Sequence, residues 1–471
     1  MSISGSLNNA LSGLNVTSRK AEVVSNNIAN ALTEGYGRRE LETASTLGGV
    51  RVVSITRNVD PGLTSDRRIA EATLNADQRT ADMLGKVEAL LGTPDDSDSI
   101  SARLSAFESA LVFAASDPSS DQRLSQINST MTSLFDKMKS STTQIQALRQ
   151  EADLDIKDDI LALNRNLKMV EELNADITRA KSVGQDTSSM LDARQQIVDD
   201  ISAIVPVREL DRGGDQLALI TTSGMILIDG KAAEFEFSNT PTIVADMTLS
   251  SGGLSGITRN GVPLNGSGGF GKLSGGSLEA AFAARDNILV QSQSGLDEFA
   301  YDLAMRFQNT TTEPTLVSNG AITDSGGLVE SMYFDGLAGR LVLNSVFDPK
   351  SGGVLSAWRD GVGVATAGPT GNSVQISRYI NALSSEGGAN GSSAADAMSQ
   401  LSSRFSQERL NSEMKLSFSA ARWDNLHNAE LAGGVDTDVE LQNLLRVEHA
   451  YAANAKVIQT ISAMIQKIME I

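Results

Sequence analysis

The chain has 471 residues, of which 40% are hydrophobic, 21% charged and only 4% aromatic. This length is sufficient for several domains with a substantial core. The few aromatic residues favour long helices and small sheets that pack through Leu, Ile, Val and Ala. The net charge of −19 disfavours a nucleic-acid partner, which needs clustered Lys and Arg. It also disfavours binding to an anionic membrane surface.

The chain contains no cysteine, which excludes a disulfide, a thiolate nucleophile and a zinc–sulfur site. No apolar run approaches the length that spans a bilayer. The first six residues lack the basic and apolar segments of a cleavable secretory signal. We therefore expect a protein that is cytosolic, or that is exported by a route that reads no cleavable signal.

A helix is predicted from residue 3 to Asn30 or shortly beyond, before Gly35. Apolar or small residues recur within it at spacings of three and four, with Thr17 as the polar exception, which places them on one stripe of a helix. They are Ile3, Leu7, Ala10, Leu14, Ala21, Val24 and Ile28.

A second striped helix is predicted at the other end of the chain. It begins after Gly433-Gly434 with a capping box, Thr437-x-x-Glu440. Its stripe has one polar position, Asn454, and consists otherwise of Leu444, Val447, Tyr451, Ile458, Ile461, Ile465 and Ile468.

These two stripes share a physical problem, because a lone amphipathic helix leaves its apolar face in water. Each helix could pack on its own domain. Two matched stripes at opposite ends of one chain instead favour pairing with each other and with neighbouring subunits, as in a coiled coil.

The interior begins with a helical pattern from Ser119 to about Lys181, which predicts one long helix or two nearly continuous ones. Its heptad phase shifts by four residues after Ala152. Such a stutter relaxes supercoiling without ending the helix. About 60 residues at 1.5 Å each extend roughly 90 Å, which indicates a rod. A further helix is predicted over Ser189–Ile204.

Strand patterns follow Pro206, at Leu217–Ile220, Met225–Ile228 and Ala233–Phe237, with hairpin turns at Ser223-Gly224 and Asp229-Gly230. Residues 251–276 are rich in glycine and predict loops or edge strands. The remaining prediction is a helix over 277–308, a β or loop insert over 311–371, and helices over 373–383 and 393–431.

The predicted fold is mainly α with inserted β, an α+β chain of several nested domains. Both termini are expected at one end of the molecule and the inserts at the other. The predicted divisions are a terminal coiled-coil domain (1–65 with 435–471), a helical rod (66–205 with 277–310 and 372–434), a hairpin and glycine-rich region (206–276) and a variable insert (311–371).

The most specific segment is residues 25–38, SNNIANALTEGYGR. Its asparagines can cap backbone groups where the helix ends, and Gly35 suits a turn that a side chain would hinder. Tyr36 and Arg38 can anchor the following extended segment on a neighbour. This segment, together with Leu7, Leu11 and residues 12–14, resembles the N-terminal motif shared by flagellar rod, hook and hook-associated proteins.

Three further segments carry the same resemblance. Residues 434–455 are similar to the closing helix of this family, with Tyr451, Asn454 and Ala455 at matching positions. Residues 190–201 and 277–286 resemble segments of its hook-associated members. The chain departs from them at Asp436-Thr437, where Asn-Leu is more usual, and at residues 431–433, where a serine-containing segment is usual.

The resemblance implies a structural subunit at the junction between hook and filament, with a hook or distal-rod protein as the alternative. A coiled-coil surface adhesin is a more distant alternative. The implied partners are copies of itself in a ring or tube, the flagellar hook protein, a second junction protein and a chaperone of type III export. The implied location is the extracellular flagellum.

The predicted subunit interface consists of residues from both ends. Those of the N-terminal helix and motif are Ile3, Leu7, Leu11, Leu14, Val24, Asn27, Ile28, Asn30, Gly35, Tyr36 and Arg38. Those of the C-terminal helix, which are also the predicted chaperone contacts, are Leu444, Val447, Tyr451, Asn454, Ile458, Ile461, Ile465 and Ile468.

No residue pattern predicts catalysis, a metal or a cofactor. His427 and His449 are the only histidines, too few for a triad or a metal cluster. The acidic run at 95–98 lacks the spacing and glycine of a calcium loop. Asp324, Glu330 and Asp335 are available for a hydrolase in the variable insert, but nothing marks them. We therefore expect a structural protein and not an enzyme.

Overall fold

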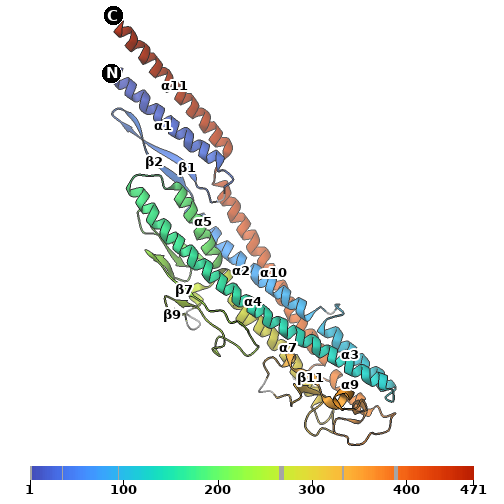
Figure 1. Cartoon of the computed structure of the whole chain (residues 1–471). Coiled ribbons are helices and arrows are strands. Elements are labelled where there is room, and N and C mark those ends of the chain that lie inside the picture. Colours follow the sequence, from blue (N-terminus) through green and yellow to red (C-terminus); the bar gives the residue numbers. More distant parts are fainter. Residues whose placement is uncertain are drawn as a thin grey trace.

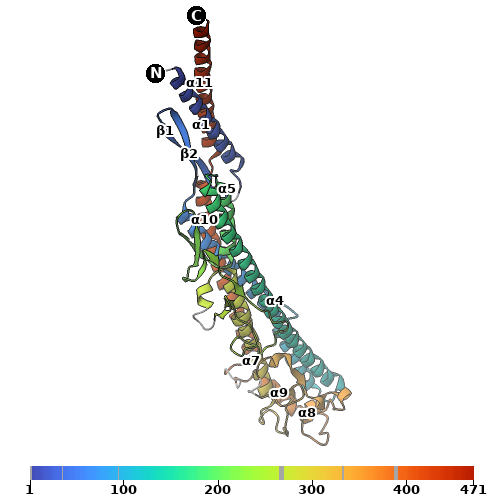
Figure 2. The ribbon, with the colours of Figure 1, turned by 60° about the vertical axis from the view of Figure 1, so that its left-hand side comes forward.

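The molecule is a long helical rod from one end of which a narrower pair of helices projects (Figures 1 and 2). The computed structural model describes residues 3–33, 35–93, 95–264, 270–330, 334–386 and 391–470. Both ends of the chain lie at the tip of the projecting pair, as expected. The predicted fold class, mainly helical with small inserted sheets, is confirmed.

The rod is built from long helices that run along its axis. They are α2 (Pro61–Leu91), α3 (Ile100–Ser116), α4 (Asp121–Ser182), α5 (Ser188–Ile204), α7 (Leu289–Phe307) and α10 (Ala394–Ala432). Neither α2 nor α3 was predicted individually. The start of α2 is well defined, because the Asp60 carboxylate accepts hydrogen bonds from the backbone N–H groups of Gly62 and Leu63.

Helix α4 is one uninterrupted helix of 62 residues, which confirms the first of the two predicted alternatives. Both phases of its stripe are buried, and Ala152 at the shift is 1% exposed. The half before this shift packs against α3 and α7, and the half after it packs against α5 and the first sheet. The shift therefore divides the rod into two consecutive hydrophobic cores.

The helix predicted over 277–308 is interrupted. It consists of α6 (Gly276–Ala283), a π turn (Ala284–Ile288) and α7. Arg285 lies in the π turn and is fully buried, with its guanidinium 2.6 Å from the buried carboxylate of Asp153 on α4. A buried charge needs such a partner, and no periodicity argument could locate this pair.

In the first β region the strands predicted at 217–220 and 225–228 are confirmed, whereas the third strand and the place of the region differ from the prediction. One antiparallel sheet has the order β3 (Val207–Asp211), β4 (Leu217–Thr221), β5 (Ile226–Asp229), β6 (Lys231–Ala232). The strand predicted over 233–237 is shorter than expected, β7 (Phe235–Glu236). It pairs in a separate sheet with β8 (Thr258–Arg259), followed by β9 (Val262–Pro263).

Both sheets lie beside α4 and not at the end of the molecule far from the termini (Figure 1). The expectation that the inserts gather at that far end was therefore wrong for residues 206–276. The reason is that β4 and β5 bury their apolar residues against the second half of α4 and against α5. The predicted loop at 265–269 lies outside the described residues.

The second insert lies at the far end, as expected (Figure 1). Its regular elements are short: β10 (Ile322–Asp324), β11 (Leu341–Leu343), the turns η4 (Leu337–Gly339), η5 (Ser345–Phe347) and η6 (Pro349–Ser351), and α8 (Ala357–Asp360), after which α9 (Val374–Ser384) returns to the rod. An aromatic cluster anchors it, in which Trp358 contacts Phe347 and Tyr379.

One buried carboxylate, Asp297 on α7, ties this insert to the rod. It is 1% exposed and accepts hydrogen bonds from the backbone N–H groups of Gly336 (2.7 Å) and Ala338 (2.9 Å). Gln293 donates a third. Burial raises the pKa of Asp297 to about 6, although these hydrogen bonds oppose the rise.

This raised pKa predicts a pH dependence of stability. The folded chain binds the Asp297 proton more tightly than the unfolded chain, so the stabilisation is complete below about pH 4 and is lost as pH rises through about 6. The free energy of unfolding of the unmodified chain, minus that of Asp297→Asn, should therefore fall by about 3 kcal/mol from pH 4 to pH 8. Denaturant titrations at both pH values measure it. For the exposed Asp82→Asn the difference should stay constant, and an equal change in both variants would contradict the prediction.

Candidate assembly interface and its joint with the rod

The two ends of the chain lie side by side as α1 (Ile3–Ala29) and α11 (Thr437–Met469) (Figures 1 and 2). A hairpin of β1 (Arg38–Thr46) and β2 (Gly49–Asn58), which was not predicted, packs against α1. The backbone N–H of Val50 near its tip donates to the Ser12 hydroxyl, 3.2 Å away. The two chain ends and this hairpin form the projecting unit.

The two helices approach each other closely at Gly13. A Cβ atom at this position would lie 2.8 Å from Nδ2 of Asn454 on α11. The absence of a side chain at Gly13 therefore gives the Asn454 side chain its place on the partner helix. The one polar position of the predicted C-terminal stripe thus lies against a glycine of α1.

The predicted stripes are only partly covered by this pairing. Val24, Val447 and Ile461 are buried. The half-buried members are Leu7, Leu14, Ile28, Leu444, Asn454 and Ile458. The exposed members are Ile3 (40%), Leu11 (49%), Tyr451 (45%), Ile465 (37%) and Ile468 (59%). The pair therefore presents apolar side chains to solvent, mostly toward its tip.

The start of α11 differs from the predicted capping box. The N-cap is Asp436, whose carboxylate accepts hydrogen bonds from the backbone N–H groups of Asp438 and Val439. Thr437, the predicted cap, is the first helical residue. Glu440 is therefore free of a capping role, and its side chain is 1% exposed and lies 2.8 Å from Nε of Arg38.

The motif after α1 forms a turn organised by Asn27, which is 1% exposed. Its side-chain oxygen accepts hydrogen bonds from the Tyr36 hydroxyl (2.9 Å) and from the Arg39 backbone N–H (3.0 Å). Gly35 has φ 75°, a conformation that favours glycine. The Asn30 side chain bonds the Asn26 carbonyl, as a cap of the helix end does.

The polar groups of Tyr36 and Arg38 are thus satisfied within the chain: the hydroxyl by Asn27 and the guanidinium by Glu440. Burial raises the pKa of Tyr36 above its ordinary value, although the Arg39 guanidinium over its ring opposes this. Their contact with a neighbouring subunit stays a prediction.

Asp192 on α5 joins the projecting unit to the rod. Its carboxylate accepts hydrogen bonds from the Gly37 backbone N–H (3.1 Å), from Arg39 (3.1 Å) and from Arg57 of β2 (2.6 Å). Arg57 also donates to the Gly35 carbonyl and to Gln195. One carboxylate therefore fixes the turn and the hairpin on the same helix.

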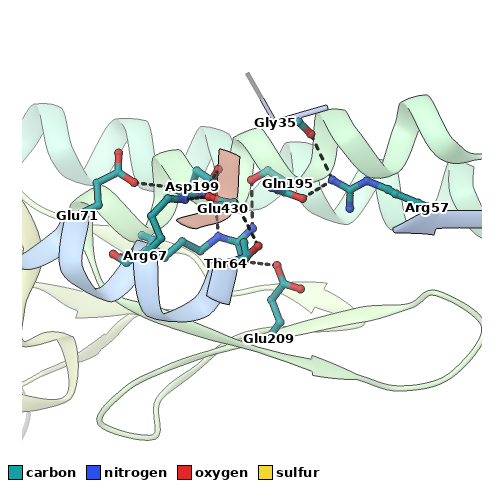
Figure 3. Close-up of polar contacts among 11 residues, drawn as sticks. Gly35, Arg57, Thr64, Arg67, Glu71, Gln195, Asp199, Glu209 and Glu430 are labelled. Carbon is teal, nitrogen blue, oxygen red and sulfur yellow. Dashed lines mark hydrogen bonds and ion pairs between the residues drawn. The ribbon is translucent and has the colours of Figure 1, made fainter. Parts of the chain in front are cut away.

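A second cluster, one to two turns further along α5, holds α2, α5, β3 and α10 together (Figure 3). Arg67 is paired with Asp199 (2.7 Å), Glu71 (2.7 Å) and Glu430 (2.5 Å). Arg68 is paired with Asp199 and Glu209. Glu430 belongs to the last turn of α10, just before the Gly433-Gly434 break that leads into α11. We call this cluster and the Asp192 contacts the joint.

The two arginines of the joint are buried, with residue exposures of 7% for Arg67 and 3% for Arg68. Burial alone would lower the pKa of each, but the Asp199 carboxylate and a second carboxylate (Glu430 for Arg67, Glu209 for Arg68) raise it above its ordinary value. Both therefore stay charged. Apart from Glu71, which lies on the same helix as Arg67, the carboxylates that match their charge come from other segments.

Sequence reasoning did not find the joint residues on α2. Asp192 and Asp199 stand in the segment that resembled hook-associated proteins, but the prediction gave them no role. Two features of the sequence could have indicated the joint. They are the adjacent arginines Arg67 and Arg68 in an amphipathic segment, and the aspartates within residues 190–201.

The chemistry of the remaining candidates is structural. His427 stacks on Trp423 at 4.8 Å between ring centroids, and His449 is exposed. Asp324 is paired with Arg340, and Glu330 is exposed. Among the described residues no group of three metal-ligating side chains could hold a metal ion. No helix in the described part of the chain is long and apolar enough to cross a membrane.

Three protein-family models match the chain, two of them at its ends. The model of the flagella basal body rod protein matches residues 7–36, and that of the flagellar basal body rod FlgEFG protein C-terminal matches residues 432–471. These ranges cover α1 with its turn, and α11. The chain is therefore a structural protein of the axial part of the bacterial flagellum, and it associates with other axial proteins.

The third model, the flagellar hook-associated protein FlgK helical domain, matches residues 84–322, more than half of the chain. The chain thus belongs to the family of flagellar hook-associated protein FlgK, also called hook-associated protein 1, as its resemblance had indicated. It is a structural protein of the hook–filament junction. Neither the hook or distal-rod alternative nor the adhesin alternative is favoured.

Individual relatives agree with this assignment. Over its whole length the chain is 24% identical to flagellar hook-associated protein 1 of Escherichia coli, all of which is covered. It is 29% identical to that of Salmonella typhimurium over 49% of this chain and 44% of that protein, and 21% identical to that of Bacillus subtilis over 98% and 97%. A solved structure, the flagellar hook junction protein FlgK from Burkholderia pseudomallei, has a TM-score of 0.46 at 17% identity, covering 56% of this chain and 47% of that one.

The joint yields a prediction about Asp199. Asp199→Ala leaves two buried guanidinium groups with one carboxylate fewer each, so the free energy of unfolding should fall by about 3 kcal/mol or more. The adjacent Asp200 is exposed, so Asp200→Ala should change the free energy of unfolding by less than about 1 kcal/mol. Denaturant titration of both variants tests this, and equal losses would show that the joint does not stabilise the rod.

Proposed function

We propose that copies of this chain assemble into a ring or tube through the pair α1–α11, which forms its inner layer. The observation that carries the proposal is the incomplete burial of the pair. Each helix covers part of the other, yet Ile465 and Ile468 of α11 and Ile3 and Leu11 of α1 stay exposed. Paired helices of neighbouring copies would cover these side chains and remove their apolar surface from water, which is favourable.

The remaining assignments extend this arrangement. The assembly domain comprises residues 1–65 with 435–471, and the rod and the two β regions lie outside it. The ring contacts the flagellar hook protein on one side and a second junction protein on the other, and so joins a bendable hook to a stiffer filament. The work of the molecule is mechanical, and we propose that it has no enzymatic activity.

Export comes before assembly. The chain leaves the cell through the flagellar type III apparatus and becomes part of the extracellular flagellum. A cytosolic chaperone covers the C-terminal stripe until then. The contacts proposed for it are Leu444, Val447, Tyr451, Asn454, Ile458, Ile461, Ile465 and Ile468, of which Ile465 and Ile468 are the exposed members nearest the end of α11.

Substitution at the tip of α11 tests the assembly role. Ile465→Glu combined with Ile468→Glu places two charges where copies would meet, while the exposure of both residues leaves the fold of the monomer intact. In a strain that lacks its own copy of the gene, the variant should leave hooks without filaments, seen by electron microscopy. Swimming should be lost with it.

The matched control is Lys467→Glu, an equally drastic change in the same turn of α11 at an exposed polar position. It should retain filaments. Circular dichroism of the purified variants should show unchanged helix content. Normal filaments in the Ile465→Glu, Ile468→Glu strain would refute assembly through this face.

Hydrogen exchange tests the monomer. Because the projecting pair has few buried side chains, we expect the amides of α1 and α11 to exchange much faster than those of α4 in dilute protein. In the assembled junction their exchange should slow. Equal protection of α11 and α4 in the dilute monomer would contradict the prediction that the ends are ordered by assembly.

A further inference from the structure

A groove runs along the rod between α2 and α10, away from the projecting pair. It has a volume of about 520 Å³, and its walls include Ala70 and Asp77 of α2 and Met414 and Phe418 of α10. Met414 is 63% exposed and Phe418 74%. They lie on the side of α10 opposite its buried residues, which include Phe405 and Ser412. A second hollow with Asp66 and Arg422 continues the groove toward the joint.

A ridge of matching character lies on α4. Leu154 and Leu161 are 43% and 55% exposed and are seven residues apart, so they share one face. This face is opposite the buried stripe that includes Ile156 and Leu163. Helices α3 and α7 pack against both α4 and α10, and in Figures 1 and 2 α4 and α10 follow different sides of the rod. The ridge and the groove therefore lie on different sides of the rod.

Both features lie at the same height along the rod. Arg79 of α2 is paired with Asp159 of α4 at 2.9 Å, next to Leu161. Asp77, two residues before Arg79 on the same helix, lines the groove beside Met414 and Phe418. A neighbouring copy set beside this one without axial displacement would thus bring its ridge to the groove.

The charges flanking the two features are complementary. Helices α4 and α10 both run toward the projecting pair (Figure 1). Along α4, an acid, Leu161 and a base follow at intervals of three and four. The groove presents a base, Phe418 and, beyond it, an acid, and two further charged residues, Asp77 and Arg422, also line it. In the described part of the chain no hydrogen bond or ion pair engages the two acids and two bases of this pattern, which are Asp158, Arg165, Lys415 and Asp66.

We propose that the α2–α10 groove binds the α4 ridge of a second copy of this chain. Leu161 enters the groove beside Phe418, Asp158 faces Lys415, and Arg165 faces Asp66. Because the two surfaces differ and lie on separate sides of one molecule, the contact is heterologous, and repetition around an axis closes it into a ring. The inference rests on the proposed function and adds a lateral contact between rods to the contact between terminal helices.

Covalent trapping tests the contact in the full chain, which has no cysteine of its own. Leu161→Cys combined with Phe418→Cys places one thiol on each surface. Flagella from a deletion strain that carries this variant are oxidised and separated by electrophoresis under denaturing conditions. Disulfide-linked multiples larger than a dimer are expected, since each copy can link to two neighbours. The control pair is Leu161→Cys with Val262→Cys, the latter 65% exposed on β9, which should give no such multiples.

The outcomes separate the two proposals. If the unmodified chain restores filaments and the double-cysteine variant gives no multiples larger than a dimer, or no more than the control pair, the lateral contact is refuted and the junction role stands. If the unmodified chain restores no filaments, the assembly role is refuted, and the lateral contact with it.

Charge exchange gives an independent measurement that needs no cysteine. Asp158→Lys and Lys415→Asp each place like charges across the contact, at every interface of the ring, and should each reduce swimming. The combination of both restores opposite charges and should recover it. If the combined variant swims no better than the worse single variant, the pairing of these two residues is refuted.

Discussion

The structure depends on one constraint: the chain must pass through the joint four times, because both of its ends return to the same place. The segments after α1 and before α11 meet the rod at the carboxylates of α5 and α10. Asp192 binds the turn and the hairpin, and Asp199 and Glu430 bind Arg67 of α2. Paired buried charges fix this meeting by direction as well as by distance, because a guanidinium presents its donors in a fixed fork.

An apolar joint would hold the same segments with less geometric definition. Apolar contacts depend on area removed from water and tolerate sliding, whereas loss of one partner of a buried ion pair leaves a charge that nothing nearby compensates. In this chain the apolar stripes provide contact between helices, and the arginine–carboxylate clusters set the angle at which the projecting pair leaves the rod.

Features with a period were predictable from the sequence. The stripes of α1 and α11, the 62 residues of α4 and its phase shift all follow from the spacing of apolar residues. The asparagine and glycine motif identified the family before any contact was known. What periodicity could not provide is pairing between distant residues: Arg38 with Glu440, Arg285 with Asp153, and Arg68 with Asp199 join segments up to 402 residues apart.

The errors have the same physical origin. Thr437 and Asp436 both suit an N-cap, and the choice follows from Glu440, which turns to Arg38 instead of back to its own helix. The strand expected at 233–237 has the right residues for a strand, but the edge of β5 is already occupied by β6. Local sequence therefore limits each segment to a few conformations, and contacts with segments far away in the chain select one. In this protein the contacts at the joint converge on α5, where Asp192 binds Arg39 and Arg57 and Asp199 binds Arg67 and Arg68, so this helix connects the projecting pair to the rod.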